Sequence, residues 1–121
     1  GCAQLEQLPN KLEAKRKLFD AYDKVFKNSK FLQLVKEPAN CKSNYWLQTI
    51  KMNSASIVLR DKILDVTNSA GYMTRPPWVL LSELDQFNSS PKSDLTVSRE
   101  LFSSLINIPS SDNIKSLNLM P

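Results

Sequence analysis

Hydrophobic residues recur along the first quarter of the chain with the period of an α-helix. Between residues 10 and 28 they return every three or four positions, which places them on one face of a helix. Pro9 precedes this stretch and favours a helix start, because the N–H that proline lacks has no partner in a first turn. We therefore expect a short helical piece up to Pro9 and a long amphipathic helix over 10–28. Its apolar positions are Leu12, Leu18, Phe19, Tyr22, Val25 and Phe26.

Two later stretches alternate between apolar and polar positions, which is the pattern of a β-strand. The first covers 31–35, and the second covers 45–52, which is rich in the aromatic and β-branched residues that favour strands. Since side chains alternate between the two faces of a strand, the second strand should place four side chains on each face. One face carries Trp46, Gln48, Ile50 and Met52, and the other carries Tyr45, Leu47, Thr49 and Lys51.

A second amphipathic helix is expected between two polar segments. Residues 53–56 supply a turn and a helix cap, and Gly71 can take the positive φ that commonly ends a helix. The helix should therefore run from Ile57 to about Ala70. Its predicted inward positions are Ile57, Leu59, Ile63, Leu64 and Val66.

The segment that follows Gly71 predicts shorter elements. We expect an extended piece over 72–74, one helical turn over 78–81 and a polar loop over 82–94. Thr96 is a plausible cap for a third helix that runs to Leu105. The inward positions of that helix are predicted to be Val97, Leu101, Phe102 and Leu105.

The end of the chain predicts one more strand and one more helix. A short strand over 106–109 is ended by its proline, and a cap at 110–112 begins a last helix. The apolar residues of that helix are Ile114, Leu117 and Leu119. Taken together, the elements predict an α+β domain in which helices pack on a small mixed sheet.

Composition excludes several classes of site. The chain has 121 residues, enough for one domain with one core. It has two glycines, too few for a GxGxxG or Walker phosphate loop, and no histidine, the commonest general base and a frequent metal ligand. The carboxylates are dispersed over predicted helix surfaces, where nearby lysines and arginines can pair with them. We therefore expect neither a self-contained enzyme nor a metal site within the chain.

The two cysteines and the N-terminal residues indicate in which compartment the protein is expected. Cys2 and Cys41 lack CxxC spacing and are expected to be reduced thiols of a cytoplasmic protein. No apolar run approaches the roughly 18 residues that span a bilayer, and no signal peptide is visible, so no membrane partner is expected. Residues 2–8 resemble the last turns of a helix that began earlier, and we expect the chain to be a fragment.

The net charge of +4 lies in residues 11–30, which carry seven cations against three carboxylates. Such a helix is usually a solvated surface, and no aromatic residues are interleaved with the cations on its basic face. The alternative function is a free-standing basic module that binds nucleic acid or an acidic protein partner. Steeply salt-dependent binding to DNA or RNA would identify that alternative.

Arg75 is the residue whose setting points most clearly to a ligand. Each of the two prolines that follow it fixes its own φ and pushes the preceding residue toward extended geometry, so the arginine should stand on a stiff arm. An arginine held this way suits bidentate binding of a carboxylate or a phosphate. The alternative is a loop that only connects two elements. Three aromatic residues could offer stacking surfaces near such a site, and the alternative is that they belong to the core: Tyr45, Trp46 and Trp78.

Four segments match motifs that occur in the same order in one family. Residues 1–8 (GCAQLEQL) fit a Gly-x-x-Gln-Leu helix that leads into a Lys/Arg-rich helix, here with Arg16 and Tyr22. Residues 43–47 (SNYWL) are similar to a strand that opens a small domain. Residues 71–78 (GYMTRPPW) fit Gly-x-x-Thr-Arg-Pro-x-Trp, and 107–111 (NIPSS) fit Asn-Leu/Ile-Pro-Ser-Ser. The chain thus resembles the DegT-type pyridoxal-phosphate-dependent sugar-nucleotide aminotransferases.

This resemblance implies an aspartate-aminotransferase-like enzyme whose C-terminal small domain is the whole chain, 1–121. The intact enzyme would move an amino group from an amino acid, with glutamate expected, to the C4 ketone of a nucleotide-linked 4-keto-6-deoxy sugar. The segments NYWL and MTRP look closest to the branch for UDP-linked amino sugars, in pathways to bacillosamine- or legionaminic-type sugars for polysaccharide biosynthesis. Pyridoxal phosphate would act as electron sink, and its lysine and aspartate partners would belong to a large domain outside the chain.

For the chain itself, the resemblance implies substrate contacts. Arg75 would lie on the small-domain side of the cleft and bind the donor carboxylate or a substrate phosphate, while Tyr45 and Trp46 would shape the sugar pocket. No catalytic, cofactor-binding or metal-binding residue is expected, and the chain alone should be inactive. The implied partners are the nucleotide sugar, the amino-acid donor and a second copy in a full-length homodimer, with no nucleic acid.

Overall fold

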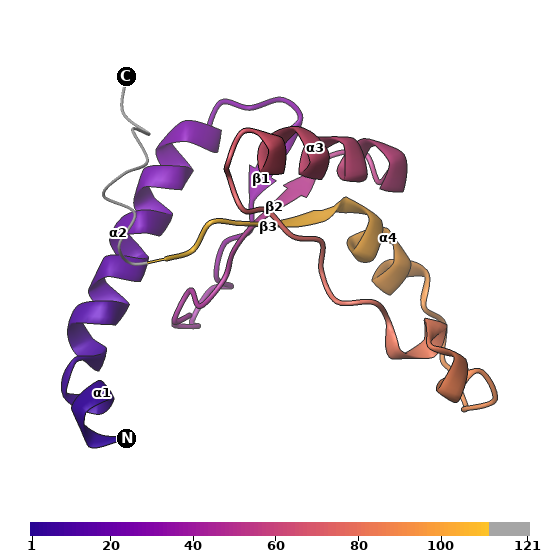
Figure 1. Cartoon of the computed structure of the whole chain (residues 1–121), viewed down its shortest axis with the longest axis horizontal. Coiled ribbons are helices and arrows are strands. Elements are labelled where there is room, and N and C mark those ends of the chain that lie inside the picture. Colours follow the sequence, from indigo (N-terminus) through magenta and orange to yellow (C-terminus); the bar gives the residue numbers. More distant parts are fainter. Residues whose placement is uncertain (112–121) are drawn as a thin grey trace.

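The computed structural model describes residues 1–111, which form an open arch with a small sheet at its centre (Figure 1). The N-terminal helices lie along one side of the arch, and the last helix lies with two 3-10 turns along the other. The elements in chain order are α1 (Cys2–Glu6), α2 (Leu8–Phe26), β1 (Leu32–Leu34), β2 (Gln48–Met52), α3 (Ile57–Ser69), η1 (Leu81–Glu83), η2 (Asp85–Phe87), α4 (Thr96–Ser104) and β3 (Leu105–Ile108).

The sheet has the strand order β1-β2-β3, and both pairings are antiparallel. Leu32 lies opposite Met52, and Gln48 lies opposite Ile108. The predicted α+β class is confirmed, but within residues 1–111 the sheet is antiparallel and not mixed. The reason is where the long connection from β2 to β3 ends: it brings the chain back to the edge of the sheet at which β2 finishes, so that Leu105, the first residue of β3, lies opposite Lys51 near the end of β2.

The core lies between one face of the sheet and the helices α2 and α3. Ile50, Met52 and Ile106 are its centre, each with at most 4% of its surface exposed. Partly buried side chains of both helices pack against it, among them Phe19 of α2 and Ile63 of α3. The predicted alternation is confirmed within β2, where every second residue from Gln48 to Met52 is buried.

The strand predicted over 45–52 starts three residues later than expected. Tyr45 has φ +47°, a left-handed conformation that strands do not contain. Because this residue turns the chain, the alternation breaks: Tyr45 is buried, and Trp46 is 71% exposed and does not share the buried face of β2. The predicted placement of Trp46 beside Ile50 was therefore wrong.

Helix α3 begins and ends as predicted, but its buried face differs. The Ser56 side chain accepts a hydrogen bond from the N–H of Leu59 (3.2 Å), and Gly71 has φ +86°. Arg60 occupies an inward position: it is 5% exposed and donates to the carbonyl of Phe102 (2.7 Å). The small sheet leaves room for little more than Ile63 and Leu64. Three predicted inward positions are exposed, namely Ile57, Leu59 and Val66.

The segment after Gly71 is more ordered than a polar loop. The helical turn predicted over 78–81 lies at Leu81–Glu83, and a second 3-10 turn follows at Asp85–Phe87. Helix α4 includes Thr96 as its first residue, so the prediction of Thr96 as the cap was wrong: the N-cap is Leu95, which makes no side-chain cap hydrogen bond. The Asp94 carboxylate accepts from the Thr96 N–H (3.0 Å) and so satisfies one N–H of the first turn. Phe102 and Leu105 are partly buried, but Val97 and Leu101 are exposed, contrary to prediction.

Strand β3 confirms the strand predicted near 106–109. The last helix, predicted to contain Ile114, Leu117 and Leu119, lies outside the described residues. Within residues 1–111, no helix is both long enough and apolar enough to cross a bilayer.

Candidate functional site

The arm that carries Arg75 is held first through Thr74. Thr74 is buried, and its N–H donates to the side-chain oxygen of Asn68 (3.1 Å). The Asn68 amide in turn donates to the carbonyl and the hydroxyl of Thr74, both at 3.1 Å. The hydroxyls of Thr67 and Thr74 lie 2.6 Å apart. The end of α3 therefore fixes the backbone immediately before the arginine.

Asn107 of β3 fixes the backbone at Arg75 itself. The two residues exchange both backbone hydrogen bonds, at 2.9 Å and 2.8 Å, and so form a bridge outside the three-stranded sheet. The Asn107 side chain extends the contact, because its oxygen accepts from the Thr49 hydroxyl (2.8 Å) and its amide approaches the carbonyl of Pro76 (3.4 Å). The prediction of a stiff, extended arm is confirmed for the backbone.

The side chain of Arg75 is exposed. Its guanidinium has no hydrogen bond or ion pair with any of the residues 1–111. This contrasts with Arg16, Arg60 and Arg99, which all pair with carboxylates. A charged fork on a fixed backbone keeps its full capacity to bind an anion.

A second fixed segment surrounds Tyr45 and Trp46. Arg16 of α2 pairs with both oxygens of Glu37, at 3.1 Å and 3.2 Å, and also donates to the carbonyl of Ser43 (2.6 Å). Glu37 accepts from the N–H of Ser43 (2.5 Å). The Arg16 guanidinium, helped by this N–H, holds the pKa of Glu37 below its ordinary value. The pair thus ties the 37–43 loop to the helix.

Tyr45 and Trp46, predicted as neighbours in one pocket, have opposite environments. The Tyr45 ring is buried, stacks on Phe19 with centroids 4.2 Å apart, and has the Arg16 guanidinium 5.3 Å from its centre. The Trp46 indole is exposed, while the Trp46 N–H donates to Asn44 (3.0 Å). The Trp46 carbonyl accepts from Lys15 (3.2 Å). Of the two rings, only that of Trp46 is presented to solvent.

The register of the sheet relates Arg75 to Trp46. Arg75 lies opposite Asn107, Asn107 lies opposite Thr49, and Trp46 precedes Thr49 by three residues. At the usual strand spacing, the Arg75 backbone is about 10 Å from that of Thr49. The bridge at Arg75 and the segment just before β2 thus present a cation that has no partner within residues 1–111 and the exposed ring of Trp46. Trp78, on the same arm as Arg75, is 87% exposed as well.

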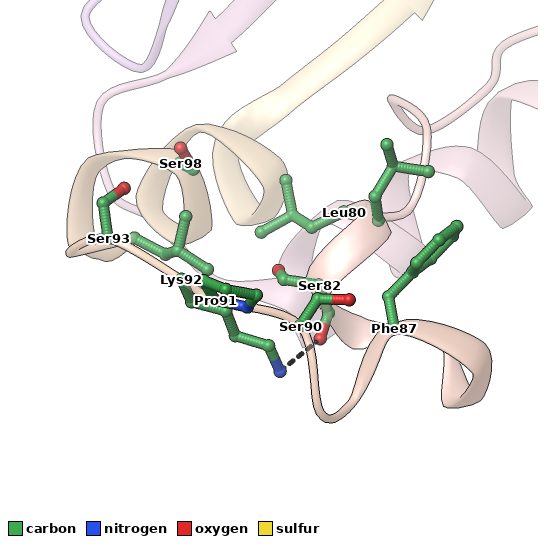
Figure 2. A pocket seen from close by; sticks show the side chains of 10 residues that line it. Leu80, Ser82, Phe87, Ser90, Pro91, Lys92, Ser93 and Ser98 are labelled. Carbon is green, nitrogen blue, oxygen red and sulfur yellow. Dashed lines mark hydrogen bonds between the residues drawn. The ribbon is translucent and has the colours of Figure 1, made fainter.

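A pocket of about 420 Å³ lies between η1, η2 and α4 (Figure 2). Leucine, proline and phenylalanine side chains line it together with several serines, and Lys92 donates to the carbonyl of Ser82 (3.0 Å). The Ser82 hydroxyl is buried and has no hydrogen-bond partner within residues 1–111. The lining includes none of Arg75, Tyr45 and Trp46, so this pocket is separate from the predicted site residues.

The basic helix is partly engaged within the domain. Lys15 donates to the carbonyls of Trp46 and Ser110, Arg16 pairs with Glu37, and Lys17 pairs with Glu13 (2.7 Å). Counting partners within residues 1–111 alone, three of the seven cations in residues 11–30 are therefore engaged. This reduces the positive surface available to a nucleic acid.

Sequence patterns did not show which contacts hold the two segments. Glu37 is 21 positions from Arg16, and Asn68 lies on a helix surface that looked solvated. Asn107 and Arg16 both stand in segments that matched motifs, but those matches did not show what either residue contacts. The roles of Arg75, Tyr45 and Trp46 in binding stay predictions.

Comparison with known proteins now assigns the family. Residues 1–119 match the profile of the DegT/DnrJ/EryC1/StrS aminotransferase family. The chain belongs to this family, and the resemblance seen in its sequence segments is confirmed. No curated protein sequence matches the chain.

Solved aminotransferases contain the same fold. PseC of Helicobacter pylori, an aminotransferase of pseudoaminic acid biosynthesis, superimposes with a TM-score of 0.87 at 17% identity, covering 98% of this chain and 32% of PseC. TlmJ of Streptoalloteichus hindustanus gives 0.85 at 18% identity, covering 98% and 31%. Spr1654 of Streptococcus pneumoniae, described as a sugar aminotransferase and solved in its PMP form, gives 0.85 at 20%, covering 98% and 31%. The chain spans about a third of the length of each.

Proposed function

We propose that this chain is the C-terminal small domain of a pyridoxal-phosphate-dependent aminotransferase that acts on a nucleotide-linked sugar. The amino donor would be an amino acid, with glutamate expected, and the acceptor the C4 ketone of a 4-keto-6-deoxy sugar of the bacillosamine or legionaminic type. Family membership supports the reaction class. The names of PseC and Spr1654, both connected with sugars, support a sugar acceptor.

The cofactor's covalent site is expected outside this chain. Structures of Spr1654 in PLP and PMP forms support pyridoxal phosphate as the cofactor of the full-length protein. Lys92, which lines the pocket of Figure 2, does not fit that site, because it is exposed and bonded to a backbone carbonyl. The chain's own contribution is therefore the binding and orientation of substrates.

The observation that carries the proposal is the Arg75 guanidinium, which has no partner within residues 1–111 and stands on a backbone fixed by Asn68 and Asn107. Because the backbone is already ordered, binding an anion there must order the arginine side chain but costs little further backbone entropy. A carboxylate of the donor and a phosphate of the nucleotide sugar both present two oxygens to the fork. Trp46 would line the sugar pocket beside this anion site. The buried Tyr45, which precedes Trp46, would help to shape this pocket.

Substitution of Arg75 by lysine in the full-length protein tests the proposal. Lysine keeps the charge but loses the two-pronged geometry, so kcat/KM for amino transfer should fall at least about 30-fold, equivalent to about 2–5 kcal/mol for a buried pair. Arg99→Lys is the matched control, since Arg99 is also exposed and pairs with Glu83 inside the domain (3.0 Å). Equal activity of the two variants would make the Arg75 segment a mere connector.

Running the donor and acceptor halves of the reaction separately distinguishes the two possible anions. A loss confined to the amino-acid half assigns Arg75 to the donor carboxylate, and a loss confined to the sugar half assigns it to a phosphate. We further expect residues 1–121 alone to be inactive and the full-length enzyme to be a homodimer. Amino transfer by residues 1–121 alone would contradict the proposed division of labour between the domains.

A further inference from the structure

We propose that the Arg16–Glu37 ion pair positions Trp46 as the surface on which the pyranose ring of the nucleotide sugar stacks. This inference rests on the proposed function and adds two positioning residues to it. Arg16 and Glu37 would not touch the sugar. They would act through Tyr45, whose conformation decides where the next side chain points.

The conformation of Tyr45 is the first argument. A bulky residue other than glycine at φ +47° is strained, and such strain costs on the order of 1–3 kcal/mol. Strained residues persist where their surroundings over-determine them, and they concentrate at ligand-binding sites. Here the phenol ring is stacked on Phe19 and covered by Arg16, while the Tyr45 N–H donates to the Ser43 hydroxyl (3.0 Å).

The convergence of the ion pair on one residue is the second argument. Arg16 donates to the carbonyl of Ser43, and Glu37 accepts from the Ser43 N–H. The ion pair therefore holds both backbone groups of a residue two positions before Tyr45. Arg16 and Phe19 are three positions apart on α2 and therefore share a helix face. One face of α2 thus supplies both the hydrogen bond to Ser43 and the ring that stacks on Tyr45.

The state of Trp46 is the third argument. Both of its backbone groups are bonded, to Asn44 and Lys15, yet 71% of the residue is exposed. A large aromatic ring on a fixed backbone offers an apolar, partly negative face to a ligand at little entropic cost. The C–H face of a pyranose is the complementary surface, because its hydrogens carry partial positive charge.

The positioning claim is tested first by spectroscopy on the full-length protein labelled with 5-fluorotryptophan. The fluorine signal of Trp46 is assigned as the one lost in Trp46→Phe. Glu37→Gln removes an acceptor from the pair, and Arg16→Lys removes the fork, so either change should broaden or shift this signal. Glu100→Gln is the control, since it weakens a different ion pair, that of Glu100 with Lys51 (3.2 Å). An unchanged Trp46 signal in both variants would refute the claim that the Arg16–Glu37 ion pair positions Trp46.

The stacking claim is tested by titrating the labelled proteins with UDP-N-acetylglucosamine as the probe. The probe should shift the Trp46 signal, and Glu37→Gln should raise its Kd about 3- to 10-fold, the range for losing an aromatic stacking contact. In amino transfer, KM for the sugar should rise by a similar factor while kcat and KM for the donor stay unchanged. A moved Trp46 signal with unchanged sugar affinity would refute the stacking role.

Amino-transfer activity of the wild-type protein tests the proposed function independently of the Trp46 signal. If the wild-type protein transfers no amino group to any nucleotide-linked keto sugar, the proposed function is wrong whatever the Trp46 signal does. If the wild type is active and the probe leaves Trp46 unshifted, only the present inference is wrong.

Discussion

Exchange of Asn68 for aspartate should loosen the arm of Arg75 without changing the shape of the side chain. In the wild type, the Asn68 amide donates to the carbonyl of Leu64 (2.8 Å) and to two oxygens of Thr74. Its oxygen accepts from the Thr74 N–H. Aspartate keeps this acceptor but replaces the amide donor by a second oxygen, which would face three other oxygen atoms.

The cost follows from the number of bonds lost. Each net hydrogen bond contributes about 0.5–1.5 kcal/mol, and Thr74 is buried, so its carbonyl cannot turn freely to water. Because Asn68 itself is exposed and water can replace part of the loss, we expect about 1–2 kcal/mol of local destabilisation. That corresponds to roughly 5- to 30-fold faster opening of the Thr74 and Arg75 backbone.

Amide hydrogen exchange measures this opening in the intact protein. Peptides covering 72–76 should exchange about 5- to 30-fold faster in Asn68→Asp, and almost as fast in Asn68→Ala. Ser69→Asp is the control, because it puts the same charge at the same helix end one residue away, and Ser69 is exposed. Equal exchange in Asn68→Asp and Ser69→Asp would refute the claim that Asn68 fixes the arm.

Three further predictions concern the core and the loop. Ile106→Ala should destabilise the protein by about 2–5 kcal/mol and lower the thermal midpoint, because Ile106 is fully buried. Tyr22→Phe should cost about 1 kcal/mol in a denaturant titration, since the buried hydroxyl donates to the carbonyl of Pro109 (2.9 Å). The pKa of Glu37 is lowered by Arg16, so its contribution should be complete at neutral pH and lost as pH falls through the lowered pKa. Exchange in the 37–45 loop should accelerate in that acidic window, and Glu37→Gln should remove the dependence.

Helices and strands with regular periods could be predicted from the sequence, because their pattern is local. The period of α2, the cap at Ser56 and the positive φ of Gly71 are set by residues close together in the chain. The start of β2 could not be predicted in this way. The left-handed turn at Tyr45 depends on Phe19 and Arg16, which approach it only in the folded protein.

The candidate site was predictable in part for the same reason. The prolines after Arg75 act on their immediate neighbours, so a stiff arm could be inferred. That Asn107 completes the arm follows only from the pairing of β3 with a segment 32 positions earlier in the chain. That the guanidinium has no partner within residues 1–111 is a property of the folded structure, which no local pattern shows. The exposed positions of α3 were mistaken for core because helical periodicity shows which residues share a face but not whether anything covers that face.

Separate affinities of the full-length Arg75→Met variant for its two substrates test the central claim most directly. Methionine preserves much of the length of the arginine side chain but removes the charge and all five donors. The account predicts that the affinity for one substrate, the amino donor or the nucleotide sugar, falls at least about 30-fold while the other changes less than about threefold. Wild-type affinity for both would contradict the account, because the exposed cation at Arg75 would then bind neither anion.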